Sequence, residues 1–163
     1  MRILGIDPGL EHTGWGVIEW AGQRPRYVAH GTIVTDAHES EAVRLATIQS
    51  ELTRLCLRYA VGALAAEGAY LVGKFRAETF AGLQRVLGMA LAAAGFLKLD
   101  AAVYQPAECK QGASGSGRAG KERVRQILSA MLDVSLDGDL HGTDALAVAV
   151  THGVRCAWRD RVA

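Results

Sequence analysis

The feature that most restricts the fold of this chain is a set of acidic residues placed beside apolar runs. Asp7 and Glu67 each end an apolar run, and Asp144 directly precedes another. Carboxylates in apolar surroundings are costly unless they are paired, hydrogen-bonded or bound to a cation. Together with His141, three positions before Asp144, these residues indicate one metal site that the fold assembles from distant segments.

The composition is that of a single globular domain covering residues 1–163. Half of the residues are hydrophobic and 21% are charged, with a formal net charge of +1. No charge-free apolar run reaches the roughly 18 residues of a membrane span, and the start lacks the regions of a signal peptide. Three cysteines without CxxC spacing indicate reduced thiols, no zinc site and a cytoplasmic protein.

The spacing of apolar residues predicts five strands and four helices. We expect strands at 2–7, 14–20, 27–35, 62–67 and 101–104, and helices at 40–59, about 77–95, around 124–131, and 142–158. The short connections between the first three strands predict an antiparallel meander. The later alternation of helices and strands predicts a mixed α/β sheet flanked by helices, with the first strand central.

The predicted elements place the acids where a hard cation could bind. Asp7 would lie on the first strand, Glu67 at the end of the fourth, and Asp144 in the first turn of the last helix. Carboxylates suit Mg²⁺ and Mn²⁺, and two such ions about 3.5–4 Å apart can cleave a phosphodiester. His141 and Asp144, at i and i+3, share one helix face.

Each of these residues also has a plainer interpretation when it is taken alone. Asp7 before Pro8-Gly9 could start a turn. Glu67 and His141 could be exposed surface or loop residues, and Asp144 could be a first-turn acid favoured by the helix dipole. Their joint placement is what favours a nuclease-like metal site.

Basic residues gather between positions 108 and 125, where the formal net charge is +3 around the Gly/Ser run 112–120. The run predicts a flexible loop, and Lys110, Arg118 and Lys121 could clamp DNA phosphates. A plain mobile loop is the alternative. A nucleotide-binding P-loop is excluded because Glu122 follows Lys121.

Two further segments leave alternatives open. Tyr70 is either a core aromatic or an exposed ring that stacks on an unpaired base, and Lys74 and Arg76 beside it are candidates for DNA contact. The turn at Asp7 also resembles the phosphate hairpin of actin-like ATPases. Those enzymes need two such domains, however, and 163 residues supply only one.

Taken in order, these motifs closely resemble the RuvC family of Holliday-junction resolvases over essentially the whole chain. The residues that carry the resemblance are Gly5-Ile6-Asp7-Pro8-Gly9 with Thr13-Gly14-Trp15-Gly16, then Glu67, then His141-Gly142-Thr143-Asp144-Ala145-Leu146-Ala147 with Thr151-His152. Each motif alone is unspecific, whereas their combination is highly specific.

The resemblance implies a ribonuclease H-like fold and a homodimer that cuts four-way DNA junctions by paired symmetric nicks. It also implies two Mg²⁺ or Mn²⁺ ions per active site, in-line attack of a metal-bound water, and work beside the RuvA and RuvB branch-migration complex. A non-catalytic junction-binding protein on the same scaffold is the alternative, and the intact acids argue against it.

Family roles carry over to individual positions of this chain. Asp7, Glu67, His141 and Asp144 match catalytic positions, and Tyr70 falls where many members place an aromatic that enters the junction centre. The lysines at 110 and 121 match basic DNA-contacting positions. Many members have Asp where this chain has His141, so its role as ligand, general acid or both stays open.

Overall fold

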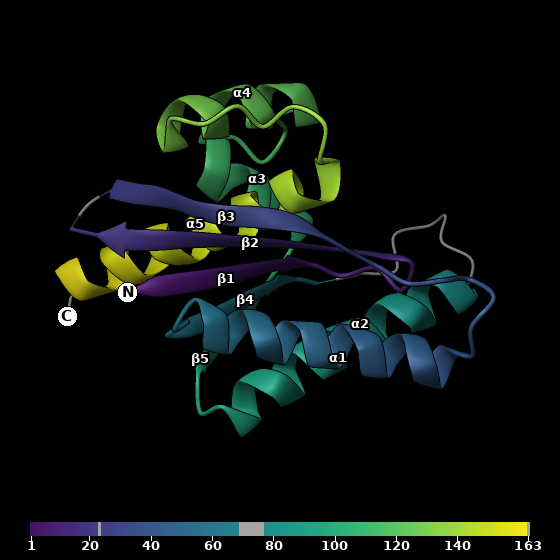
Figure 1. The fold of residues 1–163 in the computed structure, drawn as a ribbon. Helices are drawn as coiled ribbons and strands as arrows, with labels where there is room; N and C mark the ends of the chain where they lie inside the picture. Colours follow the sequence, from purple (N-terminus) through teal and green to yellow (C-terminus); the bar gives the residue numbers. More distant parts are fainter. Residues whose placement is uncertain (23, 69–76, 163) are drawn as a thin grey trace.

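A five-stranded mixed sheet forms the centre of the structure (Figure 1), a computed structural model that describes residues 1–22, 24–68 and 77–162. The strands are β1 (Arg2–Asp7), β2 (His12–Ala21), β3 (Arg24–Val34), β4 (Ala63–Glu67) and β5 (Asp100–Tyr104). Their order is β3-β2-β1-β4-β5; β1 pairs antiparallel with β2 and parallel with β4. The predicted meander, the mixed sheet and the central first strand are therefore confirmed.

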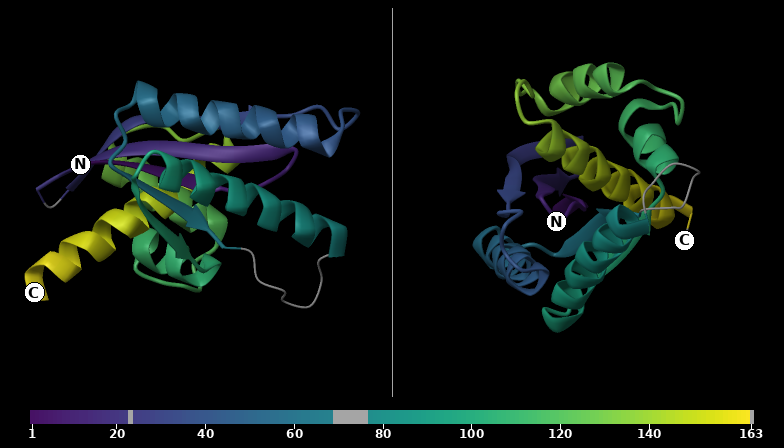
Figure 2. Two further views of the ribbon diagram at one scale, coloured as in Figure 1. Left: turned by 90° about the horizontal axis from the view of Figure 1, so that it is seen from below. Right: turned by 90° about the vertical axis from the view of Figure 1, so that its right-hand side faces the viewer.

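In the described part of the chain, five helices cover the two faces of this sheet (Figures 1 and 2). They are α1 (Glu41–Arg58), α2 (Ala77–Phe96), α3 (Pro106–Ser114), α4 (Lys121–Leu132) and α5 (Leu140–Val162). One core lies between the sheet and α1 and α2, and a second between the sheet and α4 and α5. Side chains of β1 alternate between these cores, since Ile3 enters the second while Leu4 and Ile6 enter the first.

Helix α5 packs directly on the backbone of β1 and β2 because glycines line the contact. A Cβ added to Gly5 would lie 2.0 Å from the carbonyl oxygen of Ala145, and one added to Gly14 would lie 2.1 Å from that of His141. No side chain fits into such a space. The glycines therefore let the first turns of α5 reach the end of β1, where Asp7 lies.

Helix α3 corrects one sequence-based expectation. The predicted loop 112–120 is wrong at its start, because residues 106–114 are helical and only 115–120 form no helix or strand. A capping box between Gln105 and Glu108 begins the helix, with Pro106 in its first turn. Glycine is needed at position 112 of α3, because a Cβ there would lie 2.4 Å from Oγ1 of Thr151.

Helix α2 is long and apolar enough to cross a membrane by length and composition alone, with 20 residues and a mean hydropathy of 1.2. It packs against α1, β4 and β5, as a core helix does. Helix α2 contains three glycines. A Cβ added to Gly82 would lie 3.7 Å from the side chain of Leu10. A Cβ added to Gly88 or Gly95 would meet nothing within 4 Å among the described residues. Contacts with the described residues therefore do not require glycine at any of these three positions of α2.

We expect Gly5→Ala to lower the free energy of unfolding by about 3 kcal/mol, because the new methyl would overlap backbone atoms that cannot move independently. Urea unfolding would measure the change. Gly95→Ala is the matched control and should raise stability by ~0.5–1 kcal/mol, since the site is open and helical. Equal stability of Gly5→Ala and the unchanged protein would show that α5 does not depend on this contact.

Candidate active site

A pocket of about 590 Å³ lies at the carboxyl ends of β1 and β4. It is lined by the four predicted site residues and two predicted lysines, namely Asp7, Glu67, His141, Asp144, Lys110 and Lys121. Parallel pairing sets Ile6 beside Ala66, so the two acids that follow them end neighbouring strands. Three carboxylates that are distant in sequence thus share one cavity.

Asp139 fixes the start of α5 and thereby the two predicted site residues on that helix. Its Oδ1 accepts hydrogen bonds from the backbone N–H of Gly142 at 2.9 Å and from Oγ1 of Thr32 on β3 at 2.7 Å. The carboxylate therefore caps the helix and ties it to the sheet. With the helix begun here, His141 and Asp144 lie on the face that lines the pocket.

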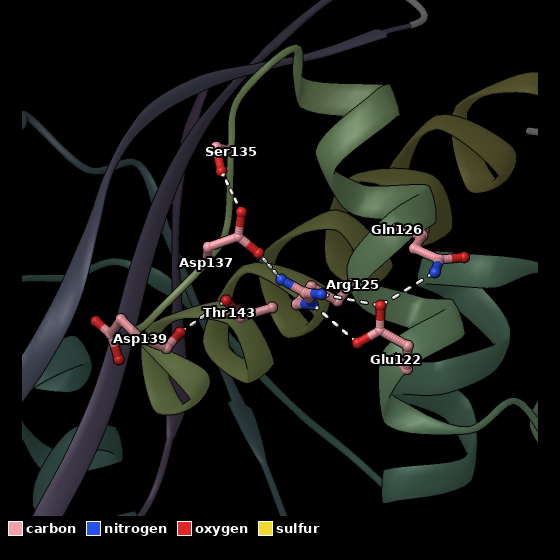
Figure 3. A network of polar contacts seen from close by, with 7 residues as sticks. All are labelled: Glu122, Arg125, Gln126, Ser135, Asp137, Asp139 and Thr143. Carbon is pink, nitrogen blue, oxygen red and sulfur yellow. Dashed lines mark hydrogen bonds and ion pairs between the residues drawn. The ribbon is translucent and has the colours of Figure 1, made fainter.

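A polar network holds α4 beside the segment that leads into α5 (Figure 3). Arg125 of α4 donates to Glu122 on its own helix and to Asp137 in that segment. Thr143 then donates to the backbone carbonyl of Asp139 at 2.7 Å. Because Lys121 is the first residue of α4, this network keeps its backbone close to α5.

The turn between β1 and β2 adds a second histidine to the site. Thr13 Oγ1 donates to the carbonyl of Gly9 at 2.6 Å, and a Cβ on Gly9 would lie 2.2 Å from the carbonyl oxygen of His12. This tight turn places the ring of His12 on that of His141, with centroids 5.4 Å apart and planes inclined by 9°. The stack restricts the orientation of the His141 ring.

Two of the acids have protein partners. Nδ1 of His141 lies 3.2 Å from Oδ2 of Asp7, and Nζ of Lys121 lies 2.6 Å from Oδ2 of Asp144. Within the described ranges, no group of three acidic, histidine or cysteine side chains has the arrangement needed to hold one metal ion. A cation held by Asp7 or Asp144 would compete with these two contacts.

The carboxylates raise one another's proton affinity. Burial, followed by repulsion from Asp7 and Asp144, raises the pKa of Glu67 to about 7. Burial also raises the pKa of Asp7, although the hydrogen bond from His141 partly offsets it. The hydrogen bond to Asp144 raises the pKa of Lys121.

This donor set fits a hard divalent cation. Three carboxylates and an imidazole surround one cavity, and their mutual repulsion is relieved by positive charge between them. Cys109 also lines the pocket but is 4% exposed, and burial raises the pKa of its thiol well above the usual range. It stays protonated and is a poor ligand and nucleophile.

The predicted DNA-contacting residues fall into three groups. Lys110 on α3 and Lys121 on α4 line the pocket, although neither lies in the loop. Arg118 is exposed in the segment 115–120 and does not line it. The predictions for Tyr70, Lys74 and Arg76 fall in 69–76, outside the described residues.

The sequence reasoning missed two residues that shape the site. Asp139 carries a usable signal, since an Asp at the start of a helical pattern is a preferred N-cap. His12 carries none, because only the fold brings it against His141.

Comparison with known proteins gives matches along nearly the full length. A family model described as "Crossover junction endodeoxyribonuclease RuvC" matches residues 3–152. Proteins of that name from Trichlorobacter lovleyi and Parvibaculum lavamentivorans are 38% and 35% identical to this chain. The matches cover 93% and 100% of this chain, and 84% and 92% of the relatives.

Solved structures agree with this similarity. The structure of Thermus thermophilus RuvC with a Holliday junction substrate superposes with a TM-score of 0.89 at 28% identity, covering 98% of this chain and 96% of the other. The yeast mitochondrial resolvase Ydc2 gives a TM-score of 0.71 at 11% identity, covering 97% and 80%, and shows likeness of fold alone.

The raised pKa of Glu67 predicts a pH-dependent cost to stability. Because its pKa in the folded protein exceeds its ordinary value of 4.5, its contribution to stability is fully present below about pH 4.5 and is lost as pH rises through about 7. In EDTA, Glu67→Gln should therefore raise Tm at pH 8 by about 5 °C and change it little at pH 5. Thermal unfolding across this range checks the trend.

Glu11→Gln, at an exposed position, is the matched control and should show no such trend. An equal change in Tm at pH 5 and pH 8 for Glu67→Gln would contradict the burial-driven shift.

Proposed function

The chain belongs to the RuvC family of crossover junction endodeoxyribonucleases, and on this premise we propose that the pocket around Asp7 is its active site. As a member of the family, the protein is a nuclease that resolves Holliday junctions by hydrolysing phosphodiester bonds. The observation that carries the proposal is the convergence of Asp7, Glu67 and Asp144, from three elements, on one cavity. The same acids make the alternative of a non-catalytic junction-binding protein unsupported.

Nucleases of this family depend on metal ions in general. We propose that Asp7, Glu67, His141 and Asp144 would hold two Mg²⁺ or Mn²⁺ ions. Such ions, when bound, supply Lewis-acid activation of water and of the scissile phosphate. The protein's own part is to hold the four ligands and to orient His141 through the His12 stack. Positive charge among the carboxylates would relieve the repulsion that raises the pKa of Glu67.

Binding of the junction is proposed to use the basic residues around the pocket. Lys110 and Lys121 line the pocket and are proposed to contact a phosphate backbone that passes its mouth. Arg118 is exposed in the segment 115–120 and is proposed as a further phosphate contact. We keep Tyr70 as the ring that stacks on an unpaired base, and Lys74 and Arg76 as further contacts; these stay predictions because their segment is not described.

The exposed face of α2 supports the proposed homodimer. Two matched nicks across one junction need two sites related by symmetry, which a twofold dimer supplies. Gly88, Leu91 and Phe96 are exposed, the last two by 37% and 84%. The sequence predicts the dimer contact on the helix around residues 77–95, because Gly82 and Gly88 permit close approach; a Cβ on Gly82 would lie 3.7 Å from Leu10, and the placement stays a prediction. Work beside RuvA and RuvB in the cytoplasm is likewise proposed from family membership.

Asp7→Asn should reduce cleavage of a synthetic four-way junction by about 10³-fold or more, because the amide keeps the shape but removes a negative charge. Junction affinity in EDTA should stay within about twofold of the unchanged protein. Rates from denaturing gels and binding from anisotropy give the two values, with exposed Asp36→Asn as control. Cleavage near the normal rate would reject the assignment of the site.

His141 should bias the choice of metal, since an imidazole suits Mn²⁺ better than Mg²⁺. Cleavage should be faster with Mn²⁺; His141→Asp should narrow the Mn²⁺-to-Mg²⁺ rate ratio, and His141→Ala should be impaired with both ions. Single-turnover rates measure these ratios. An unchanged ratio in His141→Asp would exclude His141 as a ligand and leave it as a proton donor.

Leu91→Glu should shift the protein from dimer to monomer, because it buries a charge in an apolar contact on α2. Sedimentation velocity at working concentration measures the change. Val154→Glu on α5 is the matched control, since its side chain is 40% exposed on another element. A dimer unaffected by Leu91→Glu would move the interface elsewhere, and a monomer that makes paired nicks would reject the dimer.

A further inference from the structure

The ammonium of Lys121 and the carboxylate of Asp144 form an ion pair inside the active-site pocket, with Nζ 2.6 Å from Oδ2. We propose that Lys121 and a divalent cation are alternative partners of Asp144, so that metal binding releases Lys121 to a DNA phosphate. The inference deepens the proposed function and rests on Asp144 being a metal ligand. In this proposal Lys121 has two roles: it contacts a DNA phosphate, and it pairs with Asp144 when no metal ion is bound there.

Competition follows from the distances. A Mg²⁺ ion lies about 2.1 Å from a carboxylate oxygen, and a second cation 2.6 Å from that same oxygen would be strongly repelled. The lysine can leave because its side chain is 73% exposed and its four-carbon stem is flexible. The pair is open to water on the lysine side while the Asp144 side chain is 26% exposed, so its contribution to stability is modest and a divalent cation can replace the lysine.

The surroundings explain why Lys121 is drawn to this place. Asp7 and Glu67 line the same cavity as Asp144, and all three attract the ammonium. Lys110 also lines the cavity, yet it forms no ion pair with the carboxylates among the described residues. Both lysines line the pocket, but only Lys121 forms an ion pair with Asp144 among the described residues. Lys110 is therefore a matched control.

Thermodynamic linkage makes the effect reciprocal. When Lys121 binds a junction phosphate, Asp144 loses its ion-pair partner and the affinity of the protein for metal rises. When Asp144 binds metal, the affinity for the junction rises by the same factor. Lys121 thus has opposite effects on the two ligands. It weakens metal binding to the free protein and strengthens binding of DNA to the metal-loaded protein.

The first test measures Mn²⁺ affinity without DNA, by electron paramagnetic resonance of the unbound ion. Lys121→Gln should bind Mn²⁺ up to about fivefold tighter than the unchanged protein, the size expected when a partly exposed ion pair is removed. Lys110→Gln should change the affinity by less than about twofold. If both variants bind Mn²⁺ tighter by the same factor, the cause is the loss of a positive charge near the pocket in general. That result would overturn the proposed exchange of partners at Asp144.

The second test measures the salt dependence of junction binding in EDTA and in Ca²⁺, with strand integrity checked on denaturing gels. In the unchanged protein and in Lys110→Gln, Ca²⁺ should steepen the log–log slope by about 0.9, because one more phosphate contact forms. Lys121→Gln should not show this added steepening. The same steepening in Lys121→Gln would overturn the proposal.

Asp144→Asn separates the two levels of inference. If Asp144→Asn leaves Mn²⁺ affinity unchanged, Asp144 is not a ligand, and both the proposed site and the exchange fail. If Asp144→Asn weakens Mn²⁺ binding while Lys121→Gln fails to tighten it, the metal site stands and only the exchange is rejected.

Discussion

The proposed active-site pocket depends on the backbone contact between α5 and the first two strands. Gly5 and Gly14 remove the side chains that would otherwise hold the helix away from the sheet. The helix can then bring Asp144 and His141 to the end of β1, where Asp7 already lies. Parallel pairing of β1 with β4 adds Glu67 at the same edge. One close approach and one strand pairing thus assemble a site from three distant segments of the chain.

Assembly of this site works against the stability of the fold. Burial and mutual repulsion raise the pKa of Glu67 to about 7, so the folded protein resists its ionisation near neutral pH. His141 and Lys121 partly offset the repulsion through their contacts with Asp7 and Asp144. Active sites commonly carry such local costs, which the rest of the core must outweigh. Here the two hydrophobic cores on either side of the sheet do so.

The sequence predicted the sheet well because apolar periodicity and short connections are local signals. Asp7, Glu67 and Asp144 could be found because an acid beside an apolar run is unusual. Helix α3 was missed because the Gly/Ser composition of 112–120 outweighed its capping box, and the packing of Gly112 on Thr151 is a tertiary effect. Contacts such as His12 on His141 or Lys121 on Asp144 join separate elements, so no local pattern reveals them.

The glycine contact also bears on how distant homologues can be recognised. Because backbone atoms lie on the helix side of the contact at Gly5 and Gly14, a bulkier residue at either position cannot be accommodated by a compensating substitution in α5. Outward-facing positions are free of that restraint and can diverge. A search pattern that weights the glycines of β1 and β2 together with the acids would therefore still detect homologues at low sequence identity. The acids alone are a weaker criterion, because the residue type at a proposed ligand position can differ, as the histidine at position 141 illustrates.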